Sequence, residues 1–153
     1  MTSVDTLATA VGRGLLAGFA GTAAMTVSST LEARLRGRAP SSAPARATTK
    51  VLGIREFDSD LAYARFSDLS HWGYGTGWGV VRGLLGATGM SQRRATLAHG
   101  AAIYGAAQVT LPALEIAPPS IYWGAREVAI DAFHHAVYAA ATGLAYAAIS
   151  DVA

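Results

Sequence analysis

The stretch GLLAGFAGTAAMTVSSTL, residues 14–31, contains no charged side chain, although Arg13 and Glu32 flank it directly. Two further stretches, residues 95–114 and 132–150, are equally free of Asp, Glu, Lys and Arg. A helix needs about 20 mostly apolar residues to cross the hydrocarbon core of a bilayer. Three uncharged stretches of about that length therefore predict an integral membrane protein.

The composition agrees with this prediction and excludes several classes of function. Of the 153 residues, 52% are hydrophobic and 14% are charged, whereas about a quarter of the residues in a soluble domain are charged. The chain has no cysteine, which excludes disulfides, thiolate metal sites and thiol nucleophiles. Its net charge of +2, with the basic residues concentrated in one loop, argues against nucleic-acid binding. A soluble, fully helical protein is the weaker alternative, because no amphipathic helix is present to cover the apolar ones.

We expect one all-α domain over residues 1–153, with a polar loop at residues 40–67 and a retained first helix rather than a cleaved signal peptide. A short surface helix is expected within the loop, at residues 45–53. Four spans joined by short connections form an antiparallel four-helix bundle. The predicted spans lie near residues 8–33, 70–90, 93–115 and 124–150.

The second predicted span is rich in glycine and contains one arginine. Gly75, Gly79 and Gly83 recur every four residues, which places them on one face of a helix. Small residues at this spacing let two helix backbones approach closely in lipid, and we prefer this interpretation to a flexible glycine loop because aromatic residues interleave with the glycines. We expect Arg82 to extend its guanidinium to the membrane surface, in preference to the alternative of pairing with a carboxylate or a helix-end carbonyl.

Basic residues predict the orientation of the bundle. The side that holds the long loop carries Arg34, Arg36, Arg38, Arg46, Lys50, Arg55, Arg65 and Arg126. The opposite side has Arg13, Arg93 and Arg94. Because cytoplasmic loops carry an excess of Lys and Arg, we expect the long loop in the cytoplasm and both termini outside.

The two halves of the chain share a weak pattern. His71, Tyr74 and Gly79 have the same spacing as His135, Tyr138 and Gly143, which predicts two similar helical hairpins. Four further segments are distinctive, namely GLLAGFAGTAAMT, HWGYGTGWGVVRG, HGAAIYGAAQ and DAFHHAVYAAATGLAYA. In these segments the chain resembles the YagU-like family of small uncharacterised bacterial inner-membrane proteins, and this resemblance implies a multi-span membrane fold without an established activity.

One end of the predicted bundle gathers carboxylates and imidazoles. Two Asp-x-x-His pairs, at residues 68–71 and 131–134, place a carboxylate and an imidazole on one helix face. One carboxylate from each of two helices and a carboxylate-x-x-His pair from each of the other two is the layout of di-iron carboxylate bundles, although these use Glu-x-x-His. The candidate metal ligands are Glu32, His71, Glu127, Asp131 and His134, with Asp68, Glu115 and His135 as further members.

Other interpretations of the same residues remain open. Asp is common at helix starts because it caps free amides, so the cluster can be structural. A proton or ion path through these residues and a haem held by His71 with His134 or His135 are further alternatives. His99 belongs to the opposite face, where we expect a rim residue or a partner for Gln108 or Tyr104.

No complete catalytic set is present. The sequence therefore favours a small non-enzymatic protein of the bacterial inner membrane, with the lipid bilayer as its first partner. It would act as an accessory subunit of a larger membrane complex or as a homo-oligomer. The alternative is a metal-binding redox or transport protein that holds iron, manganese or zinc at one membrane face.

Overall fold

The computed structural model describes residues 3–151, and this part of the chain is helical, without a strand. The prediction of an all-α fold is confirmed. The predicted domain also includes residues 1–2 and 152–153, which lie outside the described residues. The elements are α1 (Ser3–Arg36), α2 (Ala43–Leu52), α3 (Asp60–Ala87), α4 (Gln92–Ala113), the short 3-10 helix η1 (Ser120–Tyr122) and α5 (Ala125–Asp151).

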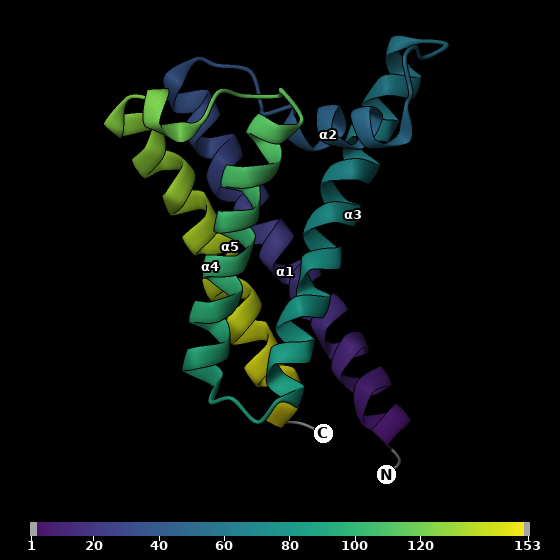
Figure 1. The fold of residues 1–153 in the computed structure, drawn as a ribbon, viewed down its shortest axis with the longest axis vertical. Helices are drawn as coiled ribbons and strands as arrows, with labels where there is room; N and C mark the ends of the chain where they lie inside the picture. The colour runs from purple at the N-terminus through teal and green to yellow at the C-terminus, as the bar shows by residue number, and fades with distance from the viewer. Residues whose placement is uncertain (1–2, 152–153) are drawn as a thin grey trace.

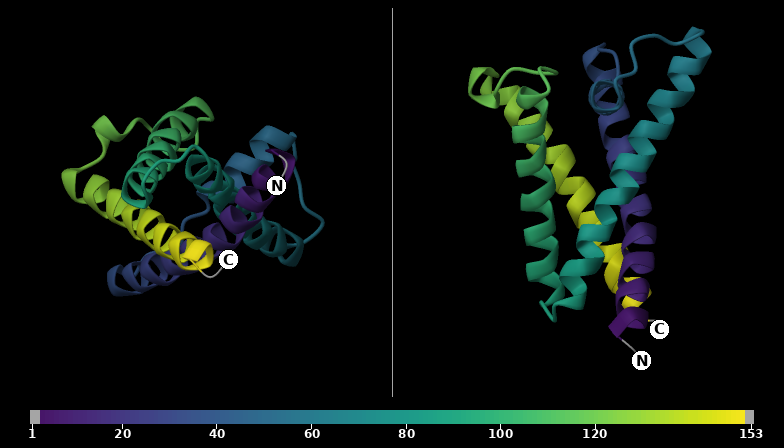
Figure 2. Two further views of the ribbon diagram at one scale, coloured as in Figure 1. Left: turned by 90° about the horizontal axis from the view of Figure 1, so that it is seen from below. Right: turned by 45° about the vertical axis from the view of Figure 1, so that its right-hand side comes forward.

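The four long helices alternate in direction along the molecule (Figure 1). Two ends result. We call the end that carries α2 and the α4–α5 connection the α2 end, and the end that carries the turn at residues 88–91 the turn end. Helix α1 packs mainly against α3 and α5, whereas α4 packs mainly against α5. Figure 2 shows α1 and α3 crossing at close range, with their two upper ends diverging.

Helix α3 begins earlier than the sequence indicated. The hydroxyl oxygen of Ser59 accepts a hydrogen bond from the Ala62 amide at 3.2 Å, which caps the helix and fixes its start at Asp60. The predicted polar loop at residues 40–67 therefore extends too far, because residues 60–67 form the first two turns of α3. The short helix expected within the loop is confirmed as α2, which ends at Leu52 and is capped by Gly53, a glycine with a φ of 68°.

The contact between α1 and α3 is made by glycine. A Cβ atom added to Gly79 would lie 2.7 Å from the Cα atom of Gly18 and would also collide with the carbonyl oxygen of Gly14. Gly75 and Gly83 are buried along the same contact. The predicted glycine stripe is therefore confirmed, and the alternative of a flexible loop is wrong, because only residues without a side chain admit backbones this close.

The distribution of side chains is inverted relative to a soluble bundle. Large apolar side chains face outward along the long helices, including Leu16 at 63% exposure, Leu97 at 65% and Leu144 at 74%. The buried hydrophobic positions are mostly alanine. Polar residues share this interior, among them Thr22, Ser70, Arg82, His99, His134 and Thr142.

One helix has the length and the apolar composition of a membrane span. This helix is α1, over Val4–Arg36, and no other helix of residues 3–151 reaches the same apolar average. A single membrane span, a signal sequence and the core helix of a soluble protein all share these properties. The N-terminal helix is thus the one segment of the described chain that is apolar enough, taken alone, to cross a bilayer.

Candidate functional site

The residues predicted to form a metal site do share the α2 end, but they are divided among different partners. On α1, Glu32 binds two arginines. Arg36 donates through Nη1 to Oε1 of Glu32 at 2.9 Å, and Arg38 pairs with the same carboxylate. Both carboxylate oxygens are therefore engaged by guanidinium groups, which hold them as acceptors in charge-assisted hydrogen bonds.

Arg36 also connects α1 to α5. Its Nη1 atom donates to Oε2 of Glu127 at 2.9 Å, and its Nη2 atom donates to Oε1. This two-point contact matches the planar fork of a guanidinium to a carboxylate. Glu127, proposed as a metal ligand, is thus the partner of an arginine instead.

His134 lies beside this ion network. Its Nδ1 atom is 2.9 Å from the hydroxyl oxygen of Ser28 on α1, and its Nε2 atom is 3.8 Å from Oε2 of Glu32. The side chain of His134 is 6% exposed. We call the group formed by these residues the rim cluster, and its members are Glu32, Arg36, Arg38, Glu127 and His134.

The second predicted histidine belongs to a different contact. The Nε2 atom of His71, on α3, lies 2.7 Å from the hydroxyl oxygen of Thr26 on α1. This hydrogen bond engages the nitrogen that would hold a haem iron, so the structure gives no support to the bis-histidine alternative. The neighbouring Asp68 is exposed on the surface of α3.

The remaining predicted ligands pair locally. Asp131 accepts a hydrogen bond from Gln108 at 3.2 Å and lies 3.5 Å from Nδ1 of His135. Glu115 follows α4 and pairs with Lys50 of α2 at 3.3 Å.

The predicted convergence of Glu32, His71, Glu127, Asp131 and His134 is therefore not found. Within residues 3–151, no group of three or more His, Asp or Glu side chains is placed to hold a metal ion. The physical reason is the position of Arg36 and Arg38, whose charges occupy the carboxylates that a metal would need. In the sequence these arginines were interpreted only as indicators of membrane orientation, and not as ion-pair partners of Glu32 and Glu127.

A second polar group lies inside the bundle, toward the turn end, and sequence reasoning missed it. Arg82 of α3 is fully buried, at 0% exposure. Its Nη2 atom donates to Gln92, the first residue of α4, and its guanidinium carbon lies 4.2 Å from the ring centre of Tyr146 on α5. The expectation that Arg82 extends to the membrane surface was wrong.

His99 of α4 is the other fully buried member, also at 0% exposure. Its Nε2 atom donates to the carbonyl oxygen of Trp78 at 3.1 Å, and its ring centre lies 5.6 Å from that of Tyr138. The expected partners, Gln108 and Tyr104, are not its neighbours, because they contact Asp131 and His135 respectively. We call Arg82, Gln92, His99 and Tyr146 the inner cluster.

Spacing along α3 could have located Arg82. It follows Gly75 by seven residues and Gly79 by three, so it shares the face on which the glycines are buried. A charged residue on that face must point into the bundle rather than toward its surface. His99 has the same relation to Ala95 and Ile103, which are buried four residues away on either side.

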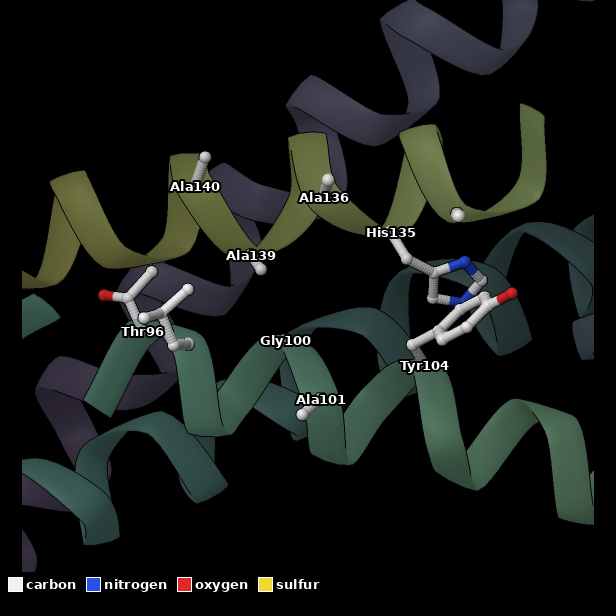
Figure 3. A pocket seen from close by; sticks show the side chains of 10 residues that line it. Thr96, Gly100, Ala101, Tyr104, His135, Ala136, Ala139 and Ala140 are labelled. Carbon is white, nitrogen blue, oxygen red and sulfur yellow. The ribbon is translucent and has the colours of Figure 1, made fainter. Parts of the chain in front are cut away.

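A groove runs between α4 and α5 on the outside of the bundle (Figure 3). Its volume is about 370 Å³, and small residues line its middle, including Gly100, Ala136 and Ala139. The rings of Tyr104 and His135 meet edge to face at one end, with their centres 5.3 Å apart. The groove lacks the convergent polar groups that a small-molecule site requires.

Comparison of the chain with protein-family models, with curated proteins and with solved structures finds no significant match.

Proposed function

We propose that this chain is a multi-pass protein of the bacterial inner membrane that acts as a structural subunit, in a homo-oligomer or a larger membrane complex, rather than as an enzyme. The observation that carries this proposal is the inverted distribution of side chains. Leucine, valine and phenylalanine point outward, whereas alanine, glycine and polar residues fill the interior. Lipid tails are as apolar as leucine, so helices in a bilayer associate through small residues and hydrogen bonds.

Helix length supports four spans. At a rise of 1.5 Å per residue, α3, α4 and α5 are about 42, 33 and 40 Å long, which is sufficient for a hydrocarbon core of about 30 Å. Arg82, His99 and Thr142 each lower the average hydropathy of their helix, although they are not its only polar residues. These residues are buried, so the surface that would meet lipid is more apolar than the whole helix.

The predicted orientation follows from the same arrangement. The α2 end carries most of the basic residues, which favours the cytoplasm. Helix α2, with exposed Arg46 and Lys50 beside exposed Val51 and Leu52, has the composition of a helix that lies at a membrane surface. The turn end and both ends of the chain would then face the opposite side.

Single-cysteine labelling tests this topology directly, because the natural chain has no cysteine. The three variants are Val51→Cys in α2, Met90→Cys in the turn between α3 and α4, and Ile121→Cys between α4 and α5. Intact cells would be treated with a membrane-impermeant thiol reagent. We expect Met90→Cys to be labelled from outside, while Val51→Cys and Ile121→Cys are labelled only after the membrane is permeabilised.

The other arrangements give different patterns. If α1 is the single span, all three cysteines lie on one side and label together. If α1 is a signal sequence, intact-mass measurement finds a shortened chain, and the protein is released from membranes by alkaline washing. Either result contradicts the four-span proposal.

The structural role has its own measurement. The mass of the purified particle, corrected for bound detergent, should correspond to two or more copies of the 15.7 kDa chain or to this chain with a second protein. A chain that stays monomeric and copurifies with no other protein contradicts this part of the proposal.

A further inference from the structure

The inner cluster contains a positive charge without a matching negative charge. Arg82 is fully buried, and its guanidinium stays protonated in proteins. The ion pairs formed within residues 3–151 do not include it. Its contacts are the neutral amide of Gln92 and the ring of Tyr146. A buried charge that lacks a counter-charge is strongly unfavourable, so this position favours the binding of an anion that the described chain does not supply.

The hydrogen-bonding groups of Arg82 point to the same deficiency. Its Nε and Nη1 atoms are buried and have no hydrogen-bond partner in the described part of the chain. Both are donors, and a guanidinium has no acceptor. Buried donors of this kind normally find a partner in the protein, in bound water or in a ligand. Two unfilled donors on one buried cation therefore favour an acceptor that carries negative charge.

His99 lies against the same turn of α3. It donates from Nε2 to the carbonyl oxygen of Trp78, and in an α-helix this carbonyl also accepts from the amide of Arg82, four residues later. Since Nε2 carries the hydrogen, Nδ1 of the neutral ring is a bare acceptor. Nδ1 is buried and lacks a hydrogen-bond partner among residues 3–151. A proton at Nδ1 would turn it into a second donor beside Arg82.

We infer that Arg82 and His99 form an internal binding site for a small inorganic anion, such as a halide or nitrate, which is taken up together with a proton on His99. The charged and titratable groups that face His99 are Arg82 from α3 and Tyr138 from α5. Without an anion, Arg82 opposes a second positive charge on the imidazole. An anion bound at Arg82 offsets this repulsion, so anion binding and protonation of His99 strengthen each other.

The site has a short route to the surface. Gln92, which binds Arg82, is exposed at the start of α4, next to the turn at residues 88–91. An anion would therefore enter from the turn end. The inner cluster lies within one chain, so anion binding there does not depend on how the bundle is oriented in a membrane.

The test measures thermal unfolding of the purified, detergent-solubilised protein in sodium gluconate, with chloride or bromide replacing gluconate at constant ionic strength. A ligand that binds the folded state raises the midpoint in a saturable way. We expect a saturating rise of about 2–4 °C at pH 5.5 and a smaller rise at pH 8. The other histidines also make the midpoint depend on pH. Comparing halide with gluconate at the same pH cancels their contribution.

Variants assign the effect to the two residues. Arg82→Gln should lose the halide-dependent rise, and His99→Gln should lose its dependence on pH. Arg94→Gln is the matched control, because Arg94 is an exposed arginine at the start of α4, and it should retain the full rise. If Arg82→Gln does not fold, the chloride NMR line is measured in the presence of the natural protein instead. We expect the protein to broaden this line and added bromide to reverse the broadening.

Several results would overturn the inference. One is an equal midpoint in gluconate, chloride and bromide. Another is a rise that does not saturate, or that persists in Arg82→Gln, since either would indicate a general effect of salt. A halide effect of equal size at pH 5.5 and pH 8 would overturn the link to His99. A chloride line that the natural protein does not broaden would also count against the site.

Discussion

The two polar clusters of this molecule differ in how their charges are balanced. In the rim cluster, the carboxylates of Glu32 and Glu127 face two arginines, so positive and negative groups occur in equal number. In the inner cluster, Arg82 has no carboxylate partner among the described residues. The rim cluster is complete as it stands and joins α1 to α5, whereas the inner cluster lacks a negative charge. A balanced cluster indicates a structural contact, and an unbalanced one indicates a binding site.

The glycine contact holds α3, and with it Arg82, against α1, so the inner cluster relies on it. Gly79→Leu should cause the largest loss of stability, because the new side chain would collide with the backbone of Gly14 and Gly18. Overpacking of this kind costs about 3 kcal/mol or more. We expect a fall in the thermal midpoint of about 10 °C or failure of the protein to accumulate.

Gly77→Leu is the matched control for this substitution. Gly77 lies on the same helix and is exposed, and a Cβ atom there would meet nothing within 4 Å. Its midpoint should stay within a few degrees of that of the natural protein. Equal losses for Gly77→Leu and Gly79→Leu would show that helix propensity, and not the α1–α3 contact, determines the result.

Removal of an arginine should have opposite effects in the two clusters. Arg36→Met leaves Glu127 without its partner and removes one of the two cations at Glu32, so the midpoint should fall by a few degrees. Arg82→Met replaces an uncompensated buried charge by a shorter apolar side chain. The substitution removes the cost of keeping that charge out of water, and we expect an unchanged or raised midpoint in gluconate. A large loss for Arg82→Met would mean that its charge is already balanced.

Two tyrosines on α5 allow a finer comparison along the interior. Tyr138 donates from its hydroxyl to the carbonyl oxygen of Gly75 at 2.6 Å, whereas the hydroxyl of Tyr146 lies 3.5 Å from the carbonyl oxygen of Gly83. Tyr138→Phe should cost about 1 kcal/mol of unfolding free energy. Tyr146→Phe should cost less, and denaturant unfolding in detergent distinguishes the two. A reversed order would contradict this assignment.

The smallest effect is expected from metal removal. Because arginines occupy the carboxylates of the rim cluster, a chelator should leave the thermal midpoint unchanged. Elemental analysis of the purified protein should find less than stoichiometric iron, manganese and zinc. One metal ion per chain would restore the metal-binding alternative and would mean that Arg36 and Arg38 move away from Glu32.

The positions of the long helices could be predicted from the sequence because uncharged stretches and turn residues mark them. The glycine stripe could also be predicted, since a spacing of four residues identifies one helix face. The start of α3 could not, because its first turns are polar and resemble a loop. Resemblance to the YagU-like proteins stays a prediction.

The candidate sites were harder to predict than the helices. Hydropathy includes the charge of a residue but not the direction of its side chain, so Arg82 was predicted at the surface. Its spacing from Gly75 and Gly79 instead places it on the buried face of α3. The partners of Glu32 were missed for a different reason. Arg36 lies one turn along the same helix, but its contact with Glu127 depends on the tertiary approach of α5, which no local pattern encodes.

The contact between Arg36 and Glu127 joins positions separated by 91 residues, and this separation has a consequence for biosynthesis. Arg36 leaves the ribosome long before its partner is made. Until the last helix is synthesised and docks, the end of α1 carries an arginine that lacks its second carboxylate. A truncated chain that stops before α5 would keep this defect permanently. The same ion pair therefore distinguishes a finished molecule from an unfinished one, and protein quality control could recognise the difference.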